Sequence, residues 1–138
     1  MPEASYAEEV PLSIERVWDV IGDFSGIRKW AVLVQAESTE DTPEGKVRSL
    51  TMPDGRVVRE LLVNSEPHSY TYTLDRPDMS EYRSTVRAVA AGANATRIEL
   101  SIQFTPVDDS ATEIAADRMQ KNFRGNLKAM KRALGLPT

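Results

Sequence analysis

Six strand-like segments follow one another between residues 32 and 104, and one long amphipathic segment comes after them. In the clearest strand, residues 96–104, every second side chain is apolar: Ile98, Leu100, Ile102 and Phe104. This period of two is typical of a strand with one covered and one solvated face. The other predicted strands are 32–37, 46–52, 56–63, 69–75 and 82–90. Polar or glycine-containing turns separate them, including a polar loop at 38–45, and such turns favour an antiparallel meander.

The segment that must cover this sheet is a predicted C-terminal helix from Ser110 to about Leu134. Ser110 and Glu113 form a predicted capping box at its start, and Gly135 and Pro137 end it. Its apolar positions recur at helical spacing: Ala116, Met119, Phe123, Leu127, Met130 and Leu134. A twisted sheet of this size curls, and a curled sheet around one straight helix encloses a cavity unless large side chains fill it.

The N-terminal third predicts a strand at 6–12 and then two short helices. Ser13 caps a helix at 14–21, and Asp23 caps a second one at 24–29. Trp18 lies on the apolar face of the first helix, so we expect it to be a buried structural residue. The order of elements predicts one α+β domain over residues 1–138, with a curved antiparallel sheet of about seven strands wrapped around the terminal helix.

Composition narrows the classes of partner and chemistry. The 138 residues carry 21 acidic and 17 basic side chains, a formal charge of −4, which does not favour a nucleic-acid partner. The chain has no cysteine, and its one histidine, His68, is expected to be exposed in a turn. We therefore expect neither a metal site nor a cofactor. No stretch is apolar enough to span a bilayer, so we expect a cytoplasmic protein, monomeric or weakly dimeric.

A row of basic residues marks one side of the terminal helix: Lys121, Arg124, Lys128, Lys131 and Arg132. Spacings of three and four place them on a common face. They are interpreted either as a solvated face that complements the helix dipole or as a contact for an anionic partner or membrane surface.

Several segments together resemble the START / birch-pollen-allergen superfamily (SRPBCC), and in particular its polyketide cyclase/dehydrase-like branch. They are Ile14–Phe24 followed by Trp30, then Gly45–Arg48, Asp54-Gly55, Arg59–Leu61, Ser69–Tyr72 and the terminal helix with Gly125. The resemblance covers nearly the whole chain. It implies a helix-grip fold with an interior cavity for a hydrophobic or amphipathic ligand. It does not imply one activity, because the superfamily includes lipid carriers, hormone receptors and cyclases.

Arg48 and Glu60 are the most informative polar pair in the sequence. If Pro53-Asp54-Gly55 is a three-residue hairpin loop, Arg48 lies opposite Glu60 on the neighbouring strand. A two-residue loop would shift the register by one and separate them. The resemblance supports an inward position, because a plant-hormone-receptor branch places a ligand-linked glutamate at the position that matches Glu60. The alternative is an exposed cross-strand pair without a role.

Five further side chains are candidates for contact with a ligand. Tyr72 and Tyr82 lie on strand faces that alternation predicts to be inward, and each combines an apolar ring with a hydroxyl group. Trp30, Met119 and Phe123 are candidate cavity residues whose alternative role is ordinary core packing. For catalysis the sequence offers no standard motif, and the candidates are Glu60, Tyr72 and Tyr82.

Three functions remain open from the sequence. The first is binding or transport of a small hydrophobic or amphipathic ligand, such as a lipid or polyketide, whose polar end meets Arg48 and Glu60. The second is a cyclase or dehydratase acting at the same residues. The third is an interaction module of the co-chaperone kind.

Overall fold

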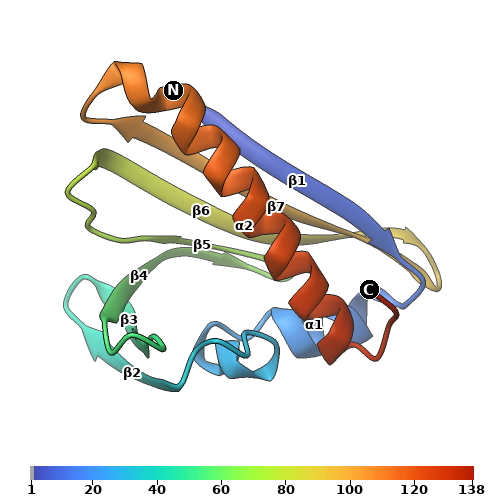
Figure 1. Ribbon diagram of the computed structural model, residues 1–138. Coiled ribbons are helices and arrows are strands. Elements are labelled where there is room, and N and C mark those ends of the chain that lie inside the picture. Colours follow the sequence, from blue (N-terminus) through green and yellow to red (C-terminus); the bar gives the residue numbers. More distant parts are fainter. Residues whose placement is uncertain (1) are drawn as a thin grey trace.

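The fold is described by a computed structural model, which covers residues 2–138 (Figure 1). In chain order the elements are β1 (Glu3–Val10), α1 (Ile14–Ile21), η1 (Phe24–Lys29), β2 (Ala36–Thr42), β3 (Gly45–Thr51), β4 (Val57–Glu66), β5 (Ser69–Thr73), β6 (Met79–Gly92), β7 (Ala95–Pro106), η2 (Asp109–Ala111) and α2 (Thr112–Ala133). The two η elements are 3₁₀ turns. This is the α+β helix-grip fold that the sequence predicted.

The seven strands form one antiparallel sheet in the order β1-β7-β6-β5-β4-β3-β2. Strands β2 to β7 are a meander, as the turn residues predicted, and β1 pairs with β7 along its whole length, from Glu3 opposite Gln103 to Val10 opposite Thr96. The first and last strands of the chain are therefore neighbours, and α1 and η1 bridge to the far edge of the sheet, where β2 begins (Figure 1).

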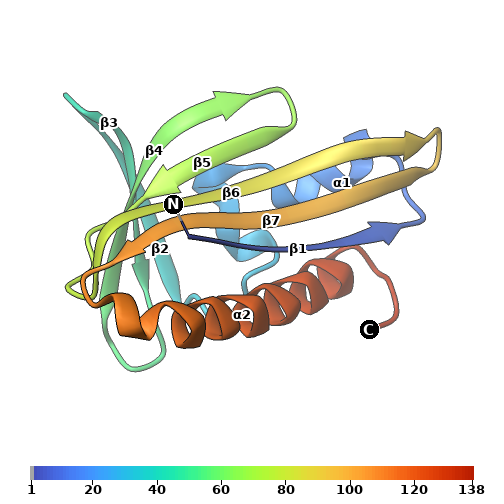
Figure 2. The same ribbon diagram turned by 90° about the horizontal axis from the view of Figure 1, so that it is seen from above.

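The concave face of the sheet is covered by two different parts of the chain. Helix α2 packs mainly on β1, with smaller contacts to β7 and α1. Helix α1 packs on β6 and β7, and η1 packs on β2. Figure 2 shows α2 running beneath β1 and β7 while β2, β3 and β4 curl away from it. The inner face of β3 to β5 is thus left to η1 rather than to α2.

The predicted helical stripe forms the core between α2 and the sheet. Met119, Phe123, Leu127, Met130 and Leu134 are all buried. Opposite them, Ile98, Leu100, Ile102 and Phe104 of β7 are buried as the alternation predicted. None of the helices between residues 2 and 138 is long and apolar enough to cross a membrane.

The strand predicted at 32–37 is wrong, and so is the polar loop predicted at 38–45. Val32 and Leu33 lie in a turn with 78% and 67% of their surface exposed, and β2 occupies residues 36–42. β2 is an edge strand whose side chains are mostly solvated, so it carries no alternation of apolar and polar residues. Pairing with β3, which the local sequence does not reveal, makes it a strand.

The start of the terminal helix also differs from the prediction. Ser110 belongs to η2, where its amide is capped by the side chain of Asp108 at 3.0 Å. α2 begins at Thr112, and Ala111 precedes it without a side-chain cap. The capping box of Ser110 and Glu113 is therefore wrong, because the 3₁₀ turn displaces the helix start by two residues.

Trp18 and His68 both lie in environments that differ from the predicted ones. Trp18, expected to be buried, is half-buried, and His68, expected to be exposed, is half-buried against it. Their rings meet edge to face with centroids 6.0 Å apart. The turn between β4 and β5 therefore brings His68 against Trp18 of α1.

Candidate functional site

The β3–β4 hairpin has the register that places Arg48 opposite Glu60. The loop closes through the Met52 amide, which donates to the Arg56 carbonyl at 2.8 Å, and Gly55 has the positive φ of 86° that glycine tolerates. Pro53, Asp54 and Gly55 therefore form the three-residue loop, and the register prediction is confirmed.

Arg48 and Glu60 form a buried ion pair on the concave face of the sheet. Arg48 Nε donates to Glu60 Oε1 at 2.6 Å, and Arg48 Nη1 donates to the carbonyl of Phe24 at 3.1 Å. The side chain of Arg48 is 1% exposed and that of Glu60 is 9% exposed. Arg48 thus ties η1 to β3 from inside, while Glu60 retains the small accessible surface of the pair.

Three aromatic rings surround the guanidinium group of Arg48. Its Cζ lies 4.2 Å from the ring centroid of Phe24, 4.8 Å from that of Tyr72 and 5.6 Å from that of Tyr70. Rings at these distances attract a cation through their quadrupoles, and more strongly where water is excluded. The rings also contact one another, with Phe24 edge-on to Tyr70 at 5.6 Å. We call this group, Arg48, Glu60, Phe24, Tyr70 and Tyr72, the polar box.

Burial decides the protonation of the acidic members of the polar box. Burial raises the pKa of Glu60 above its ordinary value, and the neighbouring charge of Arg48 only partly offsets this. Burial also raises the pKa of Tyr72 well above its ordinary value, with the charge of Glu60 adding to the effect. For Arg48, burial lowers the pKa, but the acidic groups of Tyr70 and Glu60 outweigh it, so the group stays charged.

Tyr82 of β6 continues the polar box toward the surface. It is half-buried, and burial raises its pKa, with Arg76 opposing the rise and the charge of Glu60 adding to it. The guanidinium group of Arg76 lies 5.5 Å from the Tyr82 ring centroid. The charge of Glu60 thus raises the pKa of both Tyr72 and Tyr82.

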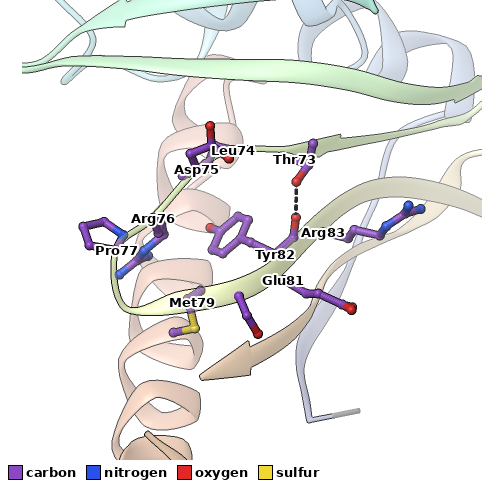
Figure 3. Close-up of a pocket in the computed structure, with 10 residues that line it drawn as sticks. Thr73, Leu74, Asp75, Arg76, Pro77, Met79, Glu81, Tyr82 and Arg83 are labelled. Atoms are coloured by element: carbon purple, nitrogen blue, oxygen red, sulfur yellow. Dashed lines mark hydrogen bonds between the residues drawn. The ribbon is translucent and has the colours of Figure 1, made fainter. Parts of the chain in front are cut away.

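A cavity of about 540 Å³ opens beside Tyr82, where β5 and β6 separate (Figure 3). The last β5–β6 pair is Tyr72 with Ser84. Before Ser84, β6 pairs with β7, and Met79 also forms an isolated bridge with Arg76. One side-chain bond still joins the two strands there, from Thr73 Oγ1 to the Tyr82 carbonyl at 2.6 Å. The lining residues are Thr73, Leu74, Asp75, Arg76, Pro77, Met79, Ser80, Glu81, Tyr82 and Arg83.

A second, smaller cavity of about 230 Å³ lies on the opposite face of the sheet. Its lining is polar throughout: Glu3, Asn64, Thr71, Arg83, Thr85, Ser101 and Gln103. Thr71 alternates with Tyr70 and Tyr72 along β5, so this hollow is separated from the polar box by the sheet itself.

The structure brings together Arg48, Glu60, Tyr72 and Tyr82, the four polar residues that the sequence nominated. Met119 and Phe123 are buried on α2, whose main partner is β1. They therefore belong to the core between α2 and the sheet rather than to the polar box. Trp30 is 5% exposed at the end of η1, and its Nε1 has no hydrogen-bond partner among residues 2–138. The ligand roles of all seven nominated residues stay predictions.

Sequence reasoning missed two members of the polar box and the residues at the cavity mouth. Tyr70 lies two residues before Tyr72, so the alternation that selected Tyr72 also placed Tyr70 inward. Phe24 was expected only as a core or cavity-mouth residue, and Arg76 had no signal, because each is brought to the site by a loop or short helix. Across residues 2–138 no group of three or more His, Asp or Glu side chains is arranged to hold a metal ion.

Comparison with known proteins gives one family and many similar structures. A family described as polyketide cyclase / dehydrase and lipid transport matches residues 1–135. Protein XoxI from Bacillus cereus is 30% identical, with a TM-score of 0.81 over 97% of this chain and 96% of its own. A search of curated proteins gives no match.

Two more distant structures share the fold. A START superfamily protein from Mycobacterium smegmatis is 13% identical, with a TM-score of 0.78 over 98% of both chains. The di-domain ARO/CYC BexL from the BE-7585A biosynthetic pathway is 12% identical, with a TM-score of 0.83 over 98% of this chain and 47% of its own. At this identity the likeness concerns the fold alone.

Proposed function

The chain belongs to the polyketide cyclase/dehydrase and lipid transport family, and from this premise we propose that it binds a small amphipathic ligand between the polar box and the cavity beside Tyr82. The observation that carries the proposal is the buried Arg48–Glu60 pair, enclosed by aromatic rings on the concave face and followed outward by Tyr82 and the cavity. Ligand sites commonly combine apolar walls with a few oriented polar groups.

Within this site Glu60 is the residue that meets the ligand, and Arg48 positions it. Arg48 is almost fully enclosed, and its Nε and Nη1 donate to Glu60 and to the Phe24 carbonyl. Glu60 accepts one charge-assisted bond and keeps some exposed surface. A raised pKa allows Glu60 to take up a proton and donate a hydrogen bond to a carbonyl or hydroxyl group of a ligand.

The direct test is saturable binding of apolar and amphipathic probes. We expect the dye 1-anilinonaphthalene-8-sulfonate and medium-chain alcohols to bind with one-to-one stoichiometry and dissociation constants of roughly micromolar size, measured by fluorescence titration and calorimetry. Leu74→Trp fills the cavity and should abolish binding, whereas Val89→Trp, on the same sheet but outside the cavity, should leave it unchanged.

A third variant distinguishes binding in the cavity beside Tyr82 from binding between α2 and the sheet. Phe123→Trp adds bulk between α2 and the sheet, where the core is already filled. If Phe123→Trp blocks a probe and Leu74→Trp does not, the ligand lies under α2 and the proposed location is wrong. If no probe in a varied panel binds the unaltered protein saturably, the binding function itself is wrong.

A cyclase or dehydratase acting at the same site is the second candidate. The specific observation in its favour is a glutamate with raised pKa within electrostatic reach of two tyrosines. Dehydration needs a base that takes a proton from carbon and an acid that gives a proton to the departing hydroxyl, which leaves as water. Glu60 could do the first and a tyrosine the second.

Turnover separates the two candidates. With linear β-hydroxy thioesters or polyketone mimics as substrates, an enzyme would release water or a cyclised product at a rate that falls at least about a hundredfold in Glu60→Gln. Glu60→Gln keeps the shape and the acceptor for Arg48, so a pure carrier would show changed affinity and no turnover in either form.

A further inference from the structure

The mouth of the cavity beside Tyr82 carries a guanidinium group that the proposed binding function does not yet use. Arg76 lies in the β5–β6 connection and lines the cavity together with Tyr82. Figure 3 shows the Tyr82 ring directed toward Arg76, whereas Glu81 and Arg83 point to the other side of β6. Arg76 Cζ lies 5.5 Å from the centroid of the Tyr82 ring.

Arg76 already holds a carboxylate in a two-bond geometry. Its Nε donates to Asp78 Oδ1 at 3.0 Å and its Nη2 donates to Asp78 Oδ2 at 2.8 Å. This fork is the arrangement in which arginine recognises carboxylates most strongly. Asp78 is only two residues away, and the side chains of Arg76 and Asp78 are 40% and 57% exposed. Solvated pairs of this kind contribute little to stability, so Asp78 is a replaceable partner.

The charges around the mouth do not exclude an anion. Three arginines balance the three acidic residues around the mouth: Arg76, Arg83 and Arg118 against Asp75, Asp78 and Glu81. The charge of Arg118 lowers the pKa of Asp78. The apolar surface beside Arg76 comes from Leu74, Pro77 and Met79. The cavity thus combines a fork for a carboxylate at its rim with an apolar wall and the polar box beyond Tyr82.

We propose that Arg76 is a specificity residue that selects ligands with a terminal carboxylate, which replaces Asp78 on the guanidinium fork while the apolar part of the ligand lies along Leu74, Met79 and Tyr82. This inference rests on the proposed binding function and narrows its ligand class to amphipathic carboxylic acids. The carboxylate stays at the rim, partly solvated, so the protein does not have to desolvate a second charge beside Glu60.

The test compares three ligands of equal chain length at pH 8: decanoate, 1-decanol and decylammonium. Calorimetry with the unaltered protein should give decanoate at least about tenfold tighter binding than decanol, and decylammonium the weakest binding. Arg76→Met keeps the apolar stem of the side chain and removes the guanidinium group. It should remove the preference for decanoate and leave the affinity for decanol within about twofold.

Two more variants complete the test. Asp78→Asn removes the competing carboxylate and should tighten decanoate binding severalfold. Arg87→Met, in β6 outside the cavity and paired with Glu99, removes an equal charge and should leave the preference unchanged. Equal binding of decanoate and decanol, or a preference that survives Arg76→Met, would overturn the assignment. Failure of all three ligands to bind would instead contradict the binding function itself.

Discussion

At the scale of single residues, the arrangement around Arg48 and Glu60 separates this chain from an ordinary sheet with cross-strand charges. The pair Arg59–Glu40 joins β4 and β2 of the same sheet, yet its side chains are 62% and 61% exposed. Burial makes the first pair energetically consequential, because each buried charge needs the other, whereas solvated pairs contribute about 0–1 kcal/mol. The same pair of residue types thus has two different roles on opposite faces of one sheet.

A double-mutant cycle measures this difference. Arg48→Met leaves Glu60 buried and unpaired, and Glu60→Leu leaves Arg48 buried without its carboxylate partner. Each single substitution should lower the free energy of unfolding by roughly 3–5 kcal/mol. The double variant should cost much less than the sum, because no unpaired charge remains. Urea unfolding of the four proteins gives the coupling energy.

The exposed pair provides the control for that cycle. Arg59→Met with Glu40→Leu should show a coupling energy below about 1 kcal/mol that falls further in high salt. A coupling energy for Arg48 and Glu60 as small as that of the control would mean that water reaches the buried pair.

The raised pKa of Glu60 gives a second prediction at this scale. Folding favours the protonated form, so the stabilising contribution of Glu60 is fully present below its unfolded pKa and is lost as pH rises through its higher folded pKa. Relative to Glu60→Gln, the natural protein should therefore lose stability as pH increases from about 4.5 upward. Parallel urea titrations at several pH values measure this. A relative gain in stability over the same range would show that attraction to Arg48 outweighs burial.

At the scale of elements, α1 and α2, the two helices that cover the sheet, differ in how tightly their glycines are packed. Gly22, after α1, lies against the Trp18 ring, and a Cβ atom there would be 2.2 Å from Trp18 Cε2. Gly125, in the middle of α2, has nothing within 4 Å of an added Cβ. The first glycine is required by packing, whereas the second is a tolerated weak point of the helix.

Paired alanine substitutions test this contrast. Gly125→Ala should stabilise the protein by about 0.5–1 kcal/mol, because alanine favours the helix and meets no obstacle. Gly22→Ala should destabilise it by roughly 1–3 kcal/mol, because the half-buried indole must move. Thermal or urea unfolding measures both. A destabilising Gly125→Ala would show that the open side of α2 contacts something in solution.

At the scale of the whole molecule, the sheet has one well-covered half and one thinly covered half. β7 lies between β1 and β6 and is covered by α2. Its residues Ile98, Leu100, Ile102 and Phe104 are all buried. β2 is an edge strand paired only with β3, and η1 is the helical element packed on it. The proposed ligand site lies between these halves, at the connection between β5 and β6.

Hydrogen exchange should follow this division. Amides of β7 should exchange slowest, at the rate of global unfolding, and those of β2 should exchange fastest among the strands, because edge strands open locally. Amide exchange followed by NMR at low protein concentration gives the order. Strong protection of β2 that increases with protein concentration would contradict the expectation and indicate pairing of β2 edges between two copies of the chain.

The sequence by itself determined the meander and the terminal helix, and it limited the β3–β4 hairpin to two registers. These depend on local information: alternation of apolar residues, a helical stripe, and Pro53-Asp54-Gly55 with the positive φ of its glycine. Because register follows from the loop, the facing of Arg48 and Glu60 was predicted on the condition that the loop has three residues, which the structure confirms.

Only the tertiary structure decided what surrounds that pair and where the cavity opens. Phe24 comes from a short helix that has no periodic pattern to indicate its direction, and its carbonyl and ring both reach Arg48. The cavity lies where the pairing between β5 and β6 ends, at Tyr72 and Ser84, while the start of β6 continues beside β7. β2 is a strand only through its pairing with β3. Such choices depend on contacts between distant segments, whose energies no local pattern of residues records.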